Sequence, residues 1–228
     1  MPQSQQRLHR FMDLDFVVPP HVLRPRPETE LLGARALTLL SELEAQSTVI
    51  DMCCGCGNLG VALAVHMPSC RVWASDVSEA AMSAAQANVE RHDVSSRVTI
   101  RRGDLFEALA EHGLQRQVDM VVCNPPYIST GKLEGSSANL LEAEPREAFD
   151  GGPFGLSVHQ RLIREALAYL KHDGALLCEF GEGQARQIEA LFKRAKGYGP
   201  VEFVIDASGM ERVAIARSLH PASARKDV

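Results

Sequence analysis

Asn124, Pro125, Pro126 and Tyr127 are consecutive residues that together could hold a flat NH₂ group. They close a predicted strand at 117–127. The two prolines lack N–H donors and keep the backbone extended, so nearby carbonyl oxygens are left without an internal partner. The Asn124 side-chain oxygen and the Pro125 carbonyl could then accept both hydrogens of the NH₂ group, while Tyr127 offers a flat face for stacking. Asn124, Pro125 and Tyr127 are therefore the predicted catalytic residues.

This arrangement suits a reaction at an amide-like nitrogen, which is a poor nucleophile because its lone pair is delocalised. Two acceptors would fix such a nitrogen, direct its lone pair at an electrophilic methyl group and stabilise the positive charge that develops on it. The alternative interpretation is a turn that simply ends the strand. Cys123 is predicted to be inert packing, since no cationic residue accompanies it in the sequence.

Carboxylates lie at or near the carboxyl ends of three further predicted strands, at Asp51, Asp76 and Asp104. In open α/β sheets the ligand binds beyond the carboxyl ends of the strands. Asp76 could accept both hydroxyls of a ribose, and Asp104 with its apolar neighbour could flank an adenine. Glycines after the first strand would let the backbone approach the ligand. The predicted cofactor-binding residues are Asp51, Cys53, Gly55, Gly57, Asp76, Asp104, Leu105 and Asn124.

Two other interpretations of these residues remain open at this point. Gly55, Gly57 and Gly60 also spell GxGxxG, and Asp76 follows at about the spacing of a nicotinamide site. Asp104 could instead cap the helix that begins after it. A nicotinamide enzyme, however, has no use for Asn124-Pro125-Pro126-Tyr127, so the two halves of the pattern together favour methyl transfer.

The elements that must position these residues alternate between strand and helix. Apolar strands interleaved with helices favour a parallel sheet covered on both faces. The last two strands are too close in sequence for a crossover helix and should form an antiparallel hairpin. We therefore expect an α/β protein of the Rossmann-like class I methyltransferase type, with a seven-stranded, mostly parallel sheet and an antiparallel C-terminal hairpin. The expected strands are 47–54, 71–76, 97–104, 117–127, 175–180, 201–206 and 212–218, and the longer helices are 28–43, 58–67, 78–92, 156–171 and 183–195.

Composition limits the classes of protein. The 228 residues suffice for one α/β domain, expected at 16–218, with a flexible polar leader at 1–15 and a flexible tail at 219–228. The net charge of −5 argues against nucleic acid as the main partner. No apolar signal or membrane segment is evident, so the six cysteines are expected to be reduced thiols of a cytoplasmic protein. No second ligand pair accompanies the cysteines at 53, 54 and 56, so no metal site is predicted.

With these residues in place, the chain resembles the HemK/PrmC family of glutamine N5-methyltransferases, which act on peptide-chain release factors. The resemblance spans about 16–217. Asn-Pro-Pro-Tyr is shared with methyltransferases of nucleic-acid amines, whereas PRPETE and EPREAFDGGPFGL are much more specific to this family. The matching segments are VLRPRPETELL (22–32), VIDMCCGCGNLGVALA (49–64), ASDVS (74–78), GDLF (103–106), VVCNPPYIS (121–129), EPREAFDGGPFGL (144–156) and ERVAIAR (211–217).

The resemblance implies S-adenosyl-L-methionine as the cofactor and a protein glutamine as the methyl acceptor. It implies that the backbone of 53–57 lines the cofactor, that Asp76 holds the ribose, and that Asn124 and Pro125 hold the target amide. The residues that it places around the substrate pocket are Pro27, Glu28, Thr29, Pro126, Glu144 and Arg146.

Two departures from the family pattern keep the acceptor open. Cys53 stands where the family has a glycine, which would be tolerated if its φ stays negative. The family also carries an N-terminal helical domain that helps dock the release factor, and only about fifteen residues precede the match here. A small molecule with an amide or guanidino nitrogen is therefore an alternative acceptor, with Glu28, Glu30 and Glu144 available to a guanidinium. A nucleic-acid amine and a non-catalytic module that only binds the cofactor are the remaining alternatives.

Overall fold

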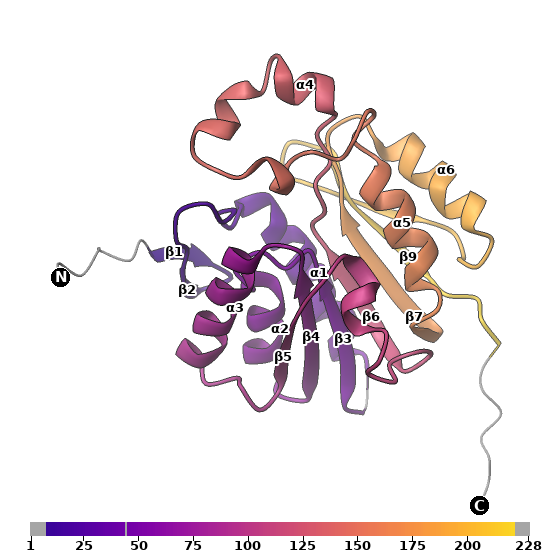
Figure 1. The fold of residues 1–228 in the computed structure, drawn as a ribbon. Coiled ribbons are helices and arrows are strands. Elements are labelled where there is room, and N and C mark those ends of the chain that lie inside the picture. Colours follow the sequence, from indigo (N-terminus) through magenta and orange to yellow (C-terminus); the bar gives the residue numbers. More distant parts are fainter. Residues whose placement is uncertain (1–7, 44, 222–228) are drawn as a thin grey trace, which may run out of the picture.

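The computed structural model describes residues 8–43 and 45–221. Seven strands form one sheet in the order β5-β4-β3-β6-β7-β9-β8 (Figure 1). All neighbouring strands are parallel except β9, which runs antiparallel to both β7 and β8. The predicted α/β class, the strand number and the C-terminal hairpin are confirmed. The strands are β3 (Ser47–Met52), β4 (Cys70–Asp76), β5 (Val98–Arg102), β6 (Val118–Cys123), β7 (Leu170–Glu179), β8 (Glu202–Ile205) and β9 (Glu211–Arg217).

Helices cover both faces of this sheet because successive strand residues point to opposite sides. On β3, Val49 belongs to the core under one group of helices, and Ile50 belongs to the core under the other group. On β6, Val122 and Val121 divide in the same way. The first group is α1 (Pro27–Ser41), α2 (Asn58–His66) and α3 (Glu79–Arg91); the second is the 3₁₀ helix η1 (Leu105–Leu109), α5 (Ser157–Ala166) and α6 (Ala185–Ala195).

The helix predicted at 156–171 is too long at its C-terminal end. Helix α5 ends at Ala166, and β7 already begins at Leu170, which pairs with Val118. The boundary falls among apolar residues that would suit the buried face of either element. No helix among the described residues is long and apolar enough to cross a membrane.

The flexible leader predicted for 1–15 is wrong from Leu8 onward; residues 1–7 lie outside the described part of the chain. Strands β1 (Leu8–Phe11) and β2 (Leu14–Val17) form an antiparallel hairpin. Phe11 and Phe16 are buried in the main core, where their rings meet edge to face at 6.2 Å. The compact unit therefore begins earlier than residue 16, while the predicted tail at 219–228 lies outside the described residues from 222 onward.

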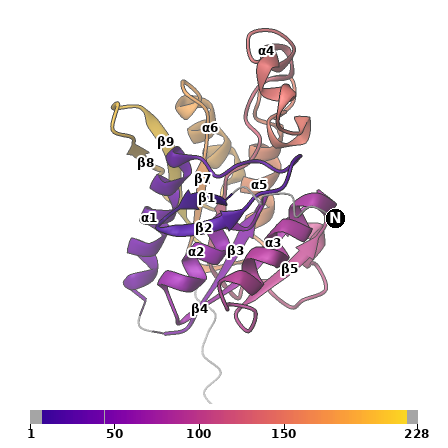
Figure 2. The ribbon, with the colours of Figure 1, turned by 90° about the vertical axis from the view of Figure 1, so that its left-hand side faces the viewer.

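The segment between β6 and α5 stands above the carboxyl ends of the strands (Figures 1 and 2). It contains α4 (Thr130–Glu134) and the 3₁₀ helices η2 (Ala138–Glu142) and η3 (Arg146–Ala148). A bridge between Ile128 and Asp150 closes its base. This segment forms the upper wall of the region in which the predicted site residues meet.

Candidate functional site

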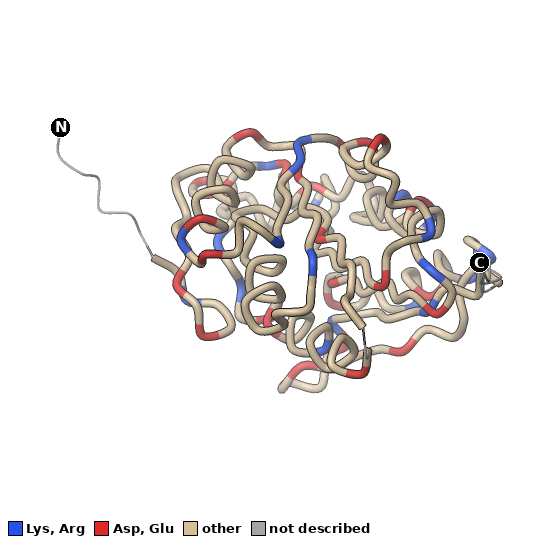
Figure 3. Tube along the Cα trace, turned by 90° about the horizontal axis from the view of Figure 1, so that it is seen from below, with Lys and Arg blue, Asp and Glu red and all other residues tan. Residues whose placement is uncertain are grey.

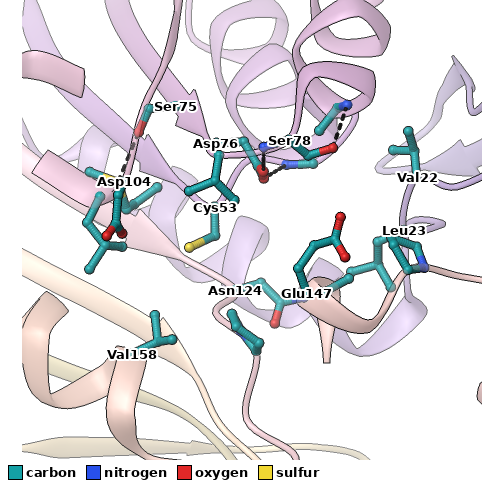
Figure 4. A pocket seen from close by; sticks show the side chains of 18 of the residues that line it. Val22, Leu23, Cys53, Ser75, Asp76, Ser78, Asp104, Asn124, Glu147 and Val158 are labelled. Carbon is teal, nitrogen blue, oxygen red and sulfur yellow. Dashed lines mark hydrogen bonds between the residues drawn. The ribbon is translucent and has the colours of Figure 1, made fainter. Parts of the chain in front are cut away.

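A cavity of about 250 Å³ opens beyond the carboxyl ends of β3, β4 and β6, where the strand order reverses on either side of β3. We call it the first cavity (Figure 4). It brings together six of the eight residues predicted to bind the cofactor, although they come from four separate stretches of sequence. The six are Cys53, Gly55, Asp76, Asp104, Leu105 and Asn124.

The loop after β3 supplies the floor of the first cavity. Cys53, Gly55 and Gly57 all have positive φ, at 57°, 54° and 76°. Cys53 therefore does not meet the condition of a negative φ under which a cysteine would be readily tolerated here. It occupies a left-handed conformation that costs a non-glycine residue roughly 1–2 kcal/mol. A Cβ built on Gly55 would meet no atom within 4 Å, so open space lies beside its backbone.

Asp76 ends β4 and holds the same loop in place. One carboxylate oxygen accepts a hydrogen bond from the Gly55 N–H, and the other accepts one from the Ser78 N–H, both at 3.0 Å (Figure 4). Burial raises the pKa of Asp76, and the hydrogen bonds from Ser78 and Gly55 act in the opposite direction. Each oxygen keeps a further lone pair, so the side chain can still accept hydrogen bonds from a ligand in the cavity.

Asp51 lies beneath the loop, where it lines a smaller neighbouring cavity with Asn58. Its Oδ2 accepts a hydrogen bond of 2.8 Å from the Gly60 N–H at the start of α2. Burial raises the pKa of Asp51 to about 7, partly opposed by this bond. Gly57 is the N-cap residue immediately before α2, and its positive φ turns the chain into that helix. Asp51 and Gly57 therefore shape the loop from below.

Asp104 and Leu105 also line the first cavity. Asp104 precedes η1, but its side chain makes no capping hydrogen bond, so the alternative of a simple helix cap is not what the structure shows. Its carboxylate is exposed and accepts hydrogen bonds from Arg161 at 2.8 and 3.0 Å. Leu105 is buried at a positive φ of 48° and presents an apolar surface beside this ion pair.

The corner after β6 separates the first cavity from a second one of about 320 Å³. Asn124 lines both cavities, Pro126 lines the first, and Pro125 and Tyr127 line the second. The corner is therefore not buried in the core; its residues line the two cavities. It stands between the cofactor-side residues and the second cavity, with the Asn124 side chain at the junction.

A buried hydrogen-bonded chain holds Asn124 from behind. The Asn124 Nδ2 group donates to Thr29 Oγ1 at 3.0 Å, and the Thr29 hydroxyl donates to Glu179 Oε2 at 2.7 Å. The Tyr127 hydroxyl donates to Glu179 Oε1 at 3.2 Å. Glu179 was not identified from the sequence, although it lies at or near the carboxyl end of a predicted strand, as the carboxylates at 51, 76 and 104 do. That shared position is the signal that could have found it.

The structure places the residues predicted to surround the substrate in different positions. Glu28 lines the second cavity, whereas Pro27 is exposed at the first turn of α1. Glu30 turns away, because its carboxylate accepts a hydrogen bond from the Met12 N–H of the hairpin.

Arg146 forms ion pairs with Glu134 and Asp150 at 2.8 and 3.0 Å. Its guanidinium is thereby held within the upper segment, which is not the pocket-wall position that was expected.

Glu144 is buried and fastens the upper segment to the stretch before α1. Its carboxylate accepts a hydrogen bond from the Arg24 N–H at 2.8 Å and a charge-assisted one from the Arg26 guanidinium. This clasp positions Leu23, which lines both cavities and was not predicted as a site residue. With two arginines beside it, Glu144 carries no free negative charge to offer a guanidinium ligand.

The chain is similar in sequence to known methyltransferases. The family model described as "Methyltransferase small domain" matches residues 32–154. The release factor glutamine methyltransferase of Geobacter sulfurreducens is 39% identical over 91% of this chain and 69% of its own length. The ribosomal protein uL3 glutamine methyltransferase of Bradyrhizobium diazoefficiens is 39% identical over 78% of this chain and 56% of its own.

A solved structure agrees with these sequence matches. The release factor-specific protein-(glutamine-N5) methyltransferase of Alicyclobacillus acidocaldarius is 27% identical, with a TM-score of 0.53 over 89% of this chain and 99% of that chain. The Geobacter match combines 39% identity with coverage of more than two thirds of both chains. The chain therefore belongs to the HemK/PrmC family of glutamine methyltransferases, which take the transferred methyl group from S-adenosylmethionine.

Proposed function

We propose that this enzyme transfers the methyl group of S-adenosylmethionine to the side-chain amide nitrogen of a glutamine in a protein, and that this protein is a peptide-chain release factor. The observation that carries the proposal is the position of Asn124 at the junction of the two cavities. Its Nδ2 group is engaged by Thr29, which leaves Oδ1 free to accept a hydrogen from the target amide. The Pro125 carbonyl, next in the chain, is the second acceptor.

The cofactor suits the first cavity by chemistry. Asp76 is the acceptor for the two ribose hydroxyls, since both of its oxygens retain a lone pair after bonding the loop. Leu105 packs against the adenine, and Asp104 with Arg161 flanks it. The open space beside Gly55 receives the part of the cofactor nearest the loop. When bound there, S-adenosylmethionine supplies an electrophilic methyl group on a positively charged sulfur.

The second cavity suits a glutamine side chain. Leu23 and Phe149 contribute apolar surface for the two methylene groups, and Tyr127 flanks the amide. Asn124 and Pro125 hold the NH₂ group and favour the geometry in which its lone pair faces the first cavity. The contribution of these residues is therefore orientation and stabilisation of developing positive charge, and no side chain has to act as a strong base.

The other acceptors are less well supported. Among the three carboxylates considered for a guanidinium, Glu144 and Glu30 are already engaged, which leaves Glu28. Acidic and basic positions are interspersed along the described chain in Figure 3, and the net charge is negative. A nucleic-acid partner would be expected to meet a concentrated basic surface.

The thiol of Cys53 gives a direct test of where the cofactor binds. Five of the six cysteines are buried, whereas Cys53 is partly exposed in the first cavity. We expect an alkylating reagent to modify Cys53 first, and S-adenosylmethionine at 100 times its Kd to slow that reaction about 100-fold by mass action. Mass spectrometry of the digested protein measures the labelled fraction over time. Equal labelling rates with and without cofactor would show that the cofactor binds elsewhere.

The acceptor is tested by comparing the methylation of candidate substrates in separate reactions. The enzyme is incubated with isotopically labelled S-adenosylmethionine and, separately, a purified bacterial release factor, a purified ribosomal protein uL3 and a mixture of free amino acids. We expect one methyl group on a glutamine of the release factor, located by tandem mass spectrometry, and none in reactions with Asn124→Ala. Faster labelling of uL3 would mean that uL3, and not the release factor, is the substrate. Labelling confined to the amino acids would contradict a protein acceptor.

A further inference from the structure

The chain Glu179–Thr29–Asn124 has a fixed direction that follows from what each group can donate. An ionised carboxylate only accepts hydrogen bonds, so the single hydroxyl proton of Thr29 must go to Glu179 Oε2. The Thr29 oxygen is then left as an acceptor, and its partner on Asn124 must be the Nδ2 group. Asn124 Oδ1, the other end of the same amide, consequently faces away from Thr29 and stays available as an acceptor.

Reversing the direction of one hydrogen bond in this series would reverse the direction of the next one. If the group at position 179 can donate to Thr29, the Thr29 hydroxyl is free to donate to Asn124. The Asn124 amide then gains the same hydrogen bond after a half-turn, with Oδ1 towards Thr29 and Nδ2 towards the substrate. An NH₂ group that faces the NH₂ of a glutamine offers it two donors and no acceptor, which is the wrong chemistry for holding it.

The fold explains why a carboxylate stands at this point. Ala175 and Leu177 of β7 point into the core beneath α1, so Glu179, two residues further along, points to the same side. It meets Thr29 in the first turn of α1, where the helix dipole favours negative charge. Both residues have only 2% of their surface exposed, so water does not compete for these bonds.

We propose that Glu179 and Thr29 are positioning residues that determine which end of the Asn124 amide faces the methyl acceptor. The inference rests on the proposed function, because it concerns the same target nitrogen. Neither residue touches the cofactor or the acceptor; both act through Asn124. Tyr127 occupies the second oxygen of Glu179 and thereby leaves Thr29 as the partner of the first.

The charged and titratable groups around Glu179 come from several elements. Arg212 of β9 lies close enough to favour the carboxylate, and Glu28 of α1 opposes it. His159 of α5 contacts the Glu179 backbone carbonyl at 2.8 Å, and burial lowers its pKa to about 4, so it is neutral at pH 7. Burial raises the pKa of Glu179 itself, and the hydrogen bonds from Thr29 and Tyr127 oppose this only in part.

Three substitutions distinguish an effect of hydrogen-bond direction from an effect of side-chain packing. Glu179→Gln keeps the shape but introduces a donor, Thr29→Val keeps the shape but removes the hydroxyl, and Thr29→Ser restores the hydroxyl. With the release factor as substrate, we expect kcat to fall at least tenfold in the first two, with the Kd of S-adenosylmethionine within threefold of wild type. We expect Thr29→Ser to stay within about threefold of wild type. The matched control is Thr38→Val, on the exposed side of the same helix.

A second readout needs no acceptor and so distinguishes this inference from the proposed function. In ¹⁵N–¹H spectra of the cofactor-loaded enzyme, the Asn124 side-chain signal is identified by its absence in Asn124→Ala. We expect at least tenfold slower exchange of one Nδ2 proton with water in wild type than in Thr29→Val or Glu179→Gln. Unchanged exchange in Glu179→Gln, or kcat within twofold of wild type in both variants, would overturn the inference. If wild type fails to methylate the release factor but shows this protection, the orientation stands and the proposed substrate falls.

Discussion

Replacing Asn124 with alanine is expected to lower kcat by about 10²–10³-fold, the usual effect of removing one well-placed polar group from a transition state. The Asn124 side chain is the first of two acceptors for the target amide. Without it, the nitrogen is less well oriented and its developing positive charge is less stabilised. The Kd of S-adenosylmethionine should change less than threefold, because Asn124 lies at the edge of the first cavity and the ribose and adenine contacts remain. Single-turnover kinetics and calorimetry on the same preparation measure the two quantities.

A matched control for this variant is Asn139→Ala, which removes an exposed asparagine from η2 in the upper segment. It should retain the kcat of wild type. Equal losses of catalysis and cofactor affinity in Asn124→Ala would mean that Asn124 supports the cofactor site, and the division of labour between the two cavities would be wrong.

Replacing Asp76 with alanine should have the opposite signature, with the larger effect on cofactor binding. Asp76 holds Gly55 and Ser78 by their backbone N–H groups while it presents lone pairs to the cavity. The variant loses two charge-assisted bonds to the ribose, each worth about 1.5–3 kcal/mol, so Kd should rise by roughly two to four orders of magnitude. Calorimetric titration with S-adenosylmethionine or its demethylated product measures this directly.

Two further variants calibrate the result for Asp76. Asp104→Ala should weaken binding less, roughly tenfold or under, because that carboxylate is exposed and shared with Arg161. Glu107→Ala removes an exposed carboxylate from the neighbouring 3₁₀ helix and should leave Kd unchanged. An unaltered Kd of S-adenosylmethionine in Asp76→Ala, with the thermal midpoint of unfolding preserved, would show that Asp76 does not bind the ribose.

The sheet and the corner after β6 were predictable because local sequence determines them. Buried strands are apolar, and two prolines end β6 whatever surrounds them. The carboxylates at 51, 76 and 104 were found because the carboxyl ends of parallel strands meet at one edge. The same reasoning applied to the strand at 175–180 would have placed Glu179 there as well.

What escaped prediction depends on contacts distant in sequence or on unusual backbone geometry. The β1–β2 hairpin turns at Met12 and Asp13, both with positive φ, which is a turn normally marked by Asn-Gly or Asp-Gly. The carboxylate of Glu144 is bound by Arg24 and Arg26, about 120 residues away, and no local pattern signals such a clasp. The positive φ of Cys53 follows from the loop around Asp76, not from the cysteine itself.

A crystal structure of the enzyme with the demethylated cofactor and its glutamine-containing substrate tests the central claim most directly. We predict that the glutamine amide nitrogen lies in the second cavity, roughly 2.7–3.2 Å from both Asn124 Oδ1 and the Pro125 carbonyl oxygen. Its free face should point at the cofactor sulfur beside Gly55 and Asp76. An amide nitrogen bound away from this corner, or an Asn124 side chain turned with Nδ2 towards the substrate, would contradict the account.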